Sequence, residues 1–219
     1  MSNDLQTALA LAPTCVAADG GAHHALAAGV DLAAVIGDMD SISKAHKTQI
    51  PPDRFHHIAE QDSTDFDKAL RSVQAPVVIA VGFAGGRVDH QLAALHTMAV
   101  RSDMAIVMLC AEDIIFVCPP KLCLEMVAGT RVSLFPMRPV TGRSQGLNWP
   151  IEGLSFAPGI QSGTSNHATG NLELEMDHPG MLCILPRNFI QPVVLALAAL
   201  PAHARWPVRA APHRDLQQW

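Results

Sequence analysis

The chain has 219 residues, of which 49% are hydrophobic and 16% charged, and its formal net charge is −5. An acidic chain lacks the basic face that a nucleic-acid-binding protein needs, and this length suits one large domain or two small ones. The five cysteines show no C-x-x-C spacing, which predicts reduced thiols rather than a zinc site. No signal peptide is recognisable, and no apolar run is long enough to span a bilayer. These features predict a globular protein of the cytoplasm.

The first half of the chain alternates between predicted helices and predicted strands. Apolar runs predict strands at residues 14–18, 33–36, 55–58 and 77–81. Helices are expected at residues 3–11, 22–28, after a cap at Ser63 or Thr64, and at 89–100. Such alternation is typical of a mostly parallel sheet with helices on both faces.

The second half has a different pattern. Short β-like runs leave no room for helices between them and predict strands at residues 105–110, 114–118, 122–127, 131–136, 172–176 and 181–185. We therefore expect an α/β domain over residues 1–120, an all-β sandwich or small barrel over 121–192, and a tail over 193–219. Pro119 and Pro120 mark the first boundary.

Acidic residues gather directly after two of the predicted strands. Asp19 follows the strand at 14–18, and Asp38 and Asp40 follow the strand at 33–36. Ligands of open α/β sheets bind at the carboxyl ends of the strands. Carboxylates gathered there repel one another unless a cation lies among them, and Mg²⁺ with a polyphosphate is the usual reason for such a cluster. A lone D-x-D pair is, however, also typical of a solvated loop.

Residues 61–68 allow two interpretations. Asp65 lies at a predicted helix start, where the helix dipole alone favours an acidic residue. Lys68 either contacts a phosphate or forms an ion pair with Asp65 one turn earlier.

A glycine-rich turn follows the strand at 77–81. Gly82, Gly85 and Gly86 let backbone N–H groups approach phosphate oxygens, and Arg87 adds a planar, permanently charged donor. Asp89 opens the next helix, where an N-cap role is the simpler alternative.

Taken together, these segments resemble the thiamine pyrophosphokinase family, which transfers a diphosphate from ATP to thiamine. The resemblance covers residues 14–190. Its motifs are Ala18–Ala22, Ile36–Ile42, Gln61–Ala69, Gly85–His90, Ser133–Pro136, Gly146–Pro150 and Gly163–Asn166.

The resemblance implies an ATP- and Mg²⁺-binding α/β domain followed by a thiamine-binding β-sandwich, in a homodimer with active sites between subunits. Asp38, Asp40 and Asp65 would hold Mg²⁺, with Arg87 and Asp89 as further catalytic residues that contact the nucleotide phosphates. The residues implied in substrate binding are Asp19, Gly20, Gly21, Gln61, Lys68, Gly85, Gly86, Arg87, His90, and, from the sandwich of the partner subunit, Ser165 and Asn166.

One part of the family pattern is missing. The family opens with an additional strand and a glycine-rich turn ahead of the segment that matches residues 14–19, whereas here residues 3–11 are predicted to be helical.

Two other functions fit parts of the sequence. A D-x-D nucleotide-sugar transferase would use Asp38 and Asp40 but does not explain Arg87, Asp89 or the β-domain. A non-catalytic thiamine- or nucleotide-binding protein would bind ligand without forming product.

Overall fold

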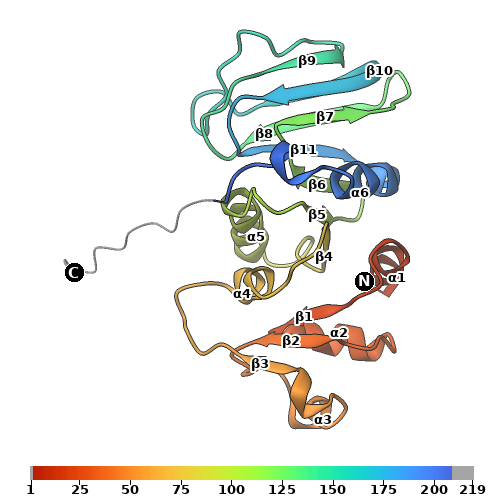
Figure 1. The fold of residues 1–219 in the computed structure, drawn as a ribbon, viewed down its shortest axis with the longest axis vertical. Coiled ribbons are helices and arrows are strands. Elements are labelled where there is room, and N and C mark those ends of the chain that lie inside the picture. Colours follow the sequence, from red (N-terminus) through yellow and green to blue (C-terminus); the bar gives the residue numbers. More distant parts are fainter. Residues whose placement is uncertain (1, 209–219) are drawn as a thin grey trace, which may run out of the picture.

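The computed structural model describes residues 2–208 (Figure 1). The first half alternates helices and strands, as predicted: α1 (Ser2–Leu11), β1 (Val16–Ala18), α2 (Ala22–Ala27), β2 (Ala34–Gly37), α3 (Lys44–Lys47), β3 (Phe55–His57), α4 (Asp65–Arg71), β4 (Val78–Val81) and α5 (Val88–Val100). The second half is mostly β-structure: β5 (Ile106–Leu109), β6 (Asp113–Val117), β7 (Lys121–Leu124), β8 (Arg131–Pro136), β9 (Gly142–Leu147), β10 (Thr164–Met176) and β11 (Met181–Pro186), followed by α6 (Ile190–Ala198).

The parallel strands are divided between two sheets. Strands β1, β2 and β3 form a three-stranded parallel sheet in that order. Strand β4 lies parallel to β5, but this pair forms one end of an eight-stranded sheet with the order β4-β5-β6-β11-β8-β10-β7, in which β9 also pairs with β10. The predicted parallel sheet is therefore present in two pieces, with no ladder between β1 and β4.

The antiparallel character predicted for the second half is confirmed from β5 onward. Strand β10 has 13 residues and pairs with different strands along its length. Thr164–His167 pair with β8, whereas Leu172–Glu175 pair with β7. One long strand therefore curls a single mixed sheet around the core, instead of two separate sheets facing each other.

The largest hydrophobic core lies inside this curled sheet. Helix α6 contributes Ile190, Val193, Val194 and Leu197 to it, all of them buried. Residues 193–198, which the sequence analysis assigned to the tail, thus form part of a packed helix. Trp206 still contacts this region, because its Nε1 donates to the Cys118 carbonyl oxygen at 2.9 Å. The remainder of the predicted tail, residues 209–219, lies outside the described residues.

Two smaller cores hold the first half together. One lies beneath β1 and β2 and includes Ala22, Leu32 and Val35, and the other joins α4 and α5 to β4–β6 through residues such as Phe66 and Met98. Among residues 2–208, no helix combines the length and apolar character needed to cross a membrane.

Candidate active site

The three-stranded sheet brings three carboxylates together at its carboxyl end. Asp19 directly follows β1, and Asp38 and Asp40 lie in the loop after β2. One carboxylate oxygen from each residue lies within 4.8 Å of the others. Because β1 and β2 are parallel neighbours in register, with Ala18 opposite Ile36, their following loops meet at one place. The spacing of the three groups fits a shared cation.

Asp19 is the most constrained member of this cluster. Its side chain is only 4% exposed, and its Oδ1 is one of two buried side-chain polar atoms without a hydrogen-bond partner within residues 2–208. Its backbone adopts a φ of 37°, in the left-handed region that few residues other than glycine, asparagine and aspartate occupy. An unpartnered carboxylate oxygen in a buried position is costly unless a cation binds it.

Asp38 is held in its charged form by neutral donors. Its Oδ2 accepts a hydrogen bond from Gln61 Nε2 at 3.0 Å, and its Oδ1 accepts one from the Asp40 backbone N–H at 3.2 Å. The Gln61 amide, followed by the Asp40 N–H, lowers the pKa of Asp38 below its ordinary value. The side chain is thus prepared to act as an anionic ligand.

Asp65 lies beside this cluster and forms an ion pair with a lysine. Thr64 caps α4 by accepting from the Asp67 N–H at 3.2 Å, which places Asp65 at the first helical position. Asp65 Oδ1 accepts from Lys68 Nζ at 3.1 Å, and the Lys68 side chain is only 2% exposed. The structure thus shows Asp65 at the start of a helix and shows the ion pair that was one of the two alternatives for Lys68. The assignment of Asp65 to a metal stays a prediction.

Gly37 makes room for this arrangement. Its φ is 152°, and a Cβ atom at this position would lie 2.8 Å from the Asp19 Cβ and 3.1 Å from Asp65 Oδ1. Glycine at the end of β2 therefore allows Asp19 and Asp65 to approach from two sides.

We expect Gly37→Ala to lower the free energy of unfolding by about 2–5 kcal/mol, because it adds steric overlap and backbone strain. Chemical denaturation measures this loss. Gly21→Ala is a matched control, because its new Cβ would meet no atom within 4 Å. Equal stabilities for the two variants would contradict the proposed crowding around Gly37.

Glu60 organises the loop that carries Gln61, a role the sequence analysis missed. Its carboxylate accepts from the backbone N–H groups of Asp62 and Ser63 at 2.8 and 3.1 Å, and from the Ser63 hydroxyl. Arg71 of α4 forms an ion pair with it at 2.5 Å. An acidic residue three positions before a serine was the only sequence signal for this turn, and such pairs are common.

This network predicts a specific pH dependence. The Ser63 hydroxyl, followed by Arg71, lowers the pKa of Glu60 from 4.5 to about 2. A pKa lowered by folding gives stability that is complete above about pH 4.5 and is lost as the pH falls toward 2. We expect the melting temperature of Glu60→Gln to change less than that of the parent chain across this interval. Glu125→Gln, at an exposed position, should follow the parent; a parent-like slope for Glu60→Gln would refute the role of this carboxylate.

The glycine-rich loop after β4 presents Arg87 and Asp89 to solvent. Gly82 and Gly85 have φ values of 87° and 81°, and the Gly85 N–H donates to Gln91 Oε1 at 3.3 Å. Arg87 Nε donates to Asp89 Oδ1 at 3.1 Å, and its Nη2 pairs with Oδ2. The paired guanidinium lowers the pKa of Asp89 to about 2. Asp89 therefore stays ionised and is a weak base.

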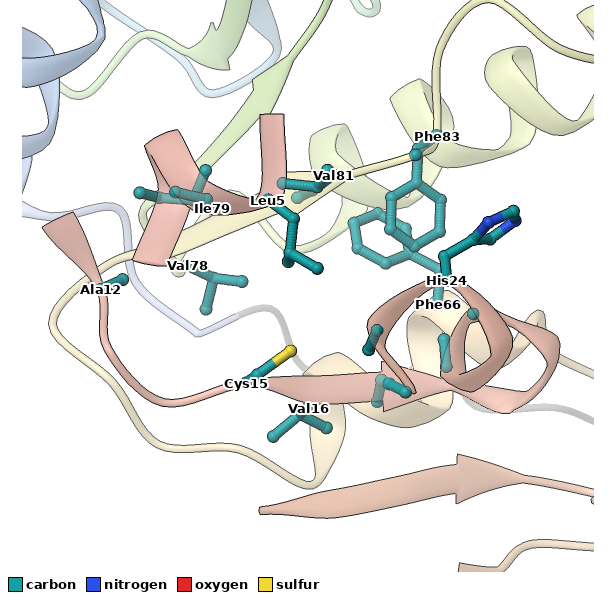
Figure 2. Close-up of a pocket in the computed structure, with 18 of the residues that line it drawn as sticks. Leu5, Ala12, Cys15, Val16, His24, Phe66, Val78, Ile79, Val81 and Phe83 are labelled. Atoms are coloured by element: carbon teal, nitrogen blue, oxygen red, sulfur yellow. The ribbon is translucent and has the colours of Figure 1, made fainter. Parts of the chain in front are cut away.

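The remaining residues of the predicted binding set lie in three places. Gly20, Gly21, Gly86 and His90, together with Arg87, line a cavity between β1 and β4. Figure 2 shows other residues that line it, among them Val16 and Val81. Ser165 is exposed on β10. Asn166 is buried, and its amide is already engaged: Nδ2 donates to the Trp149 carbonyl at 2.7 Å, and Oδ1 accepts from the Trp149 N–H at 3.2 Å.

Asn166 thus fixes the loop that exposes Trp149. The indole of Trp149 is 57% exposed, and its ring meets His167 edge-on with the centroids 5.1 Å apart. Strand β10 lies at the opposite end of the molecule from β1–β3 (Figure 1). Within one protomer, Ser165 and Asn166 are therefore not brought together with the carboxylate cluster.

The fold and the site define a class of protein: an α/β unit with carboxylates and a glycine-rich loop at the ends of parallel strands, joined to an antiparallel β-unit. The family model for the catalytic domain of thiamin pyrophosphokinase matches residues 5–108. Residues 5–108 are therefore similar to the catalytic domain of that family.

Two named relatives match part of the chain. Thiamine pyrophosphokinases 1 and 2 of rice (Oryza sativa subsp. japonica) are 26% and 28% identical over 149 and 152 residues, which is 59% of this chain and 56% of each relative. The chain thus matches little more than half the length of these relatives.

Solved structures share the fold. Thiamin pyrophosphokinase from Geobacillus thermodenitrificans superposes with a TM-score of 0.63 at 22% identity, covering 78% of this chain and 85% of that one. The enzyme from Candida albicans gives 0.64 at 17% identity, covering 79% and 81%.

Proposed function

We propose that this protein is a thiamine diphosphokinase, which transfers the diphosphate of ATP to the hydroxyl of thiamine and releases AMP. The observation that carries the proposal is the cluster of Asp19, Asp38 and Asp40 at the carboxyl end of β1 and β2, within the segment that matches the catalytic domain. ATP and thiamine are accordingly the proposed substrates.

Mg²⁺ is the proposed cofactor, and the residues present fit it. Mg²⁺ takes oxygen ligands and is usually held by one or two carboxylates together with substrate phosphates. Asp38 and Asp40 would hold it, the unpartnered Oδ1 of buried Asp19 would face it, and Asp65 borders the same group. When bound, the ion would neutralise charge on the transferred phosphates.

The protein side chains then have separable roles. In the reaction, an oxygen–phosphorus bond forms between the thiamine hydroxyl and the β-phosphorus of ATP, the bond from that phosphorus to the α-phosphate oxygen breaks, and the hydroxyl proton leaves to solvent or a base. Arg87 would contact the phosphates, with Asp89 holding its guanidinium in place. Positioning and electrostatics supply most of the catalysis of phosphoryl transfer, so no strong base is required. Asp65 and Asp89 are the candidates if one acts, and the low pKa of Asp89 disfavours it.

A homodimer would complete the site. Ser165 and Asn166, proposed to line the thiamine pocket, lie on β10, distant from the carboxylates of the same protomer (Figure 1). A partner subunit would supply them, directly through Ser165 and, for Asn166, through the Trp149 loop that it holds. A location in the cytoplasm remains part of this proposal.

Product analysis with ATP, Mg²⁺ and thiamine tests the function. AMP and thiamine diphosphate in equal amounts are expected. ADP with thiamine monophosphate would mean transfer of a single phosphate and would refute the proposed transfer of a diphosphate. Ligand binding without product would favour a non-catalytic binding protein, and turnover of a sugar nucleotide in place of ATP would favour a D-x-D transferase.

A further inference from the structure

Met39, the residue between Asp38 and Asp40, has an unusual backbone conformation. Its φ is 62°, in the left-handed region that is unfavourable for a residue with a side chain of this kind. Within residues 2–208, the only other non-glycine residue with a positive φ is Asp19. Both residues therefore lie at the candidate metal site, and a strained backbone persists only where the surrounding structure holds it in place.

The turn at Met39 brings two carboxylates together. An extended chain advances about 3.3 Å per residue, so side chains two positions apart in a strand begin roughly 6.6 Å from each other. Here one carboxylate oxygen of Asp38 lies within 4.8 Å of one from Asp40, and the Asp40 N–H donates to Asp38 Oδ1 at 3.2 Å. Two negative charges at this separation repel each other, so the turn needs support from another group.

Lys47 supplies that support. The Met39 carbonyl oxygen accepts a hydrogen bond from Lys47 Nζ at 2.8 Å, and a hydrogen bond from a charged donor is roughly twice as strong as one between neutral groups. This oxygen and the Asp40 N–H belong to the same planar peptide group. Lys47 therefore holds one end of the peptide between Met39 and Asp40, whereas the Asp38 carboxylate holds the other.

Helix α3, which carries Lys47, is fastened to the molecule without help from the carboxylates. Ser43 caps it by accepting from the His46 N–H at 3.3 Å. The Ser43 N–H donates to His23 Nε2 of α2 at 3.4 Å, and the rings of His23 and His46 lie with their centroids 4.3 Å apart. Figure 1 shows α3 at the end of the molecule that the three-stranded sheet forms. The ammonium group thus reaches Met39 from an independently fixed element.

We propose that Lys47 is a positioning residue for the metal site: through the Met39 peptide group, it keeps the carboxylates of Asp38 and Asp40 at the separation that a shared cation needs. The proposal rests on the proposed function only in taking the carboxylate cluster as a Mg²⁺ site. The buried, unpartnered Oδ1 of Asp19 supports that assignment independently of Lys47. Lys47 acts through a main-chain oxygen and need not touch the substrate.

The charge of Lys47 by itself would have the opposite effect on metal binding. An ammonium group near the carboxylates repels a divalent cation, so removal of the charge alone should tighten binding of the metal. Loss of a group that orients metal ligands should instead weaken binding, typically by about 10–100-fold. The direction of the change in metal affinity therefore separates a positioning role from simple electrostatics.

The test is a titration of the full chain with Mn²⁺ without ATP or thiamine, in which the electron paramagnetic resonance signal of the free ion reports binding. Mn²⁺ prefers the same oxygen ligands as Mg²⁺. We expect Lys47→Met, which keeps the apolar stem, to raise the dissociation constant about 10-fold. Lys47→Arg keeps a charged donor and should restore most of the affinity. Lys44→Met removes the same charge from an exposed position of the same helix and should not weaken binding.

Three results would overturn the proposal. The first is a Mn²⁺ affinity of Lys47→Met that equals or exceeds that of the parent, even if the variant melts at a lower temperature. The second is equal weakening by Lys44→Met, and the third is a parent chain that binds no Mn²⁺. A parent chain that binds Mn²⁺ but forms no thiamine diphosphate would refute the proposed function and leave the role of Lys47 intact, so the two failures are distinguishable.

Discussion

Asp40→Asn is expected to lower the turnover of ATP and thiamine by at least about 100-fold, the loss typical of removing one preorganised electrostatic contact. The substitution keeps the side-chain oxygen that accepts from the Ser41 hydroxyl at 2.8 Å, so the loop after β2 should keep its shape. It removes one negative charge from the group formed with Asp19 and Asp38. The variant should therefore lose catalysis and metal affinity together, which steady-state assays and the Mg²⁺-dependent rise in melting temperature both measure.

A matched control is Asp53→Asn, which changes an exposed carboxylate near β3 outside the cluster. It should keep parent-like turnover and the same response to Mg²⁺. Addition of EDTA should abolish turnover in the parent and control proteins alike. Parent-like turnover of Asp40→Asn in saturating Mg²⁺ would refute the assignment of this cluster to a metal.

Arg87→Ala is the second substitution with a large expected effect, a decrease in kcat/KM for ATP of about 10²–10³-fold. Arg87 is 70% exposed and paired with Asp89, so its guanidinium is oriented but still accessible to a phosphate. Arg87→Lys keeps the charge but loses the planar pair of donors, and should fall between the parent and Arg87→Ala. The measurement is kcat/KM for ATP at fixed, saturating thiamine.

The control for this series is Arg143→Ala. Arg143 is also exposed and paired with a carboxylate, Glu175, but it lies on β9, far from the glycine-rich loop. Its loss should leave kcat/KM for ATP unchanged. Equal kcat/KM values for Arg87→Ala and Arg143→Ala would contradict a phosphate-binding role for Arg87.

Arg87 and the carboxylates belong to different sheets. The carboxylates follow β1 and β2 of the three-stranded sheet, whereas Arg87 follows β4 at the end of the eight-stranded sheet. In the proposed reaction, the substrate would therefore bridge two parts of the molecule that share no ladder.

Local sequence by itself was sufficient to predict the strands and loops that carry the candidate site residues. Short apolar runs followed by Gly or Asp predicted β1, β2 and β4 and the loops that carry Asp19, Asp38 and Arg87. The start of α4 was readable to within one residue: the sequence offered Ser63 or Thr64 as the cap, and Thr64 is the cap observed, because capping depends on residues three apart. These features depend on neighbours in the chain, so periodicity and turn chemistry were sufficient to locate them.

Only the tertiary structure decided which of these residues meet. Asp19 joins Asp38 and Asp40 because β1 and β2 are parallel neighbours, whereas Asp65 pairs with buried Lys68. The break between β1 and β4, the double pairing of β10 and the packing of α6 were likewise not readable from sequence. Strand order and burial arise from contacts between residues far apart in the chain, and local patterns carry no information about those partners.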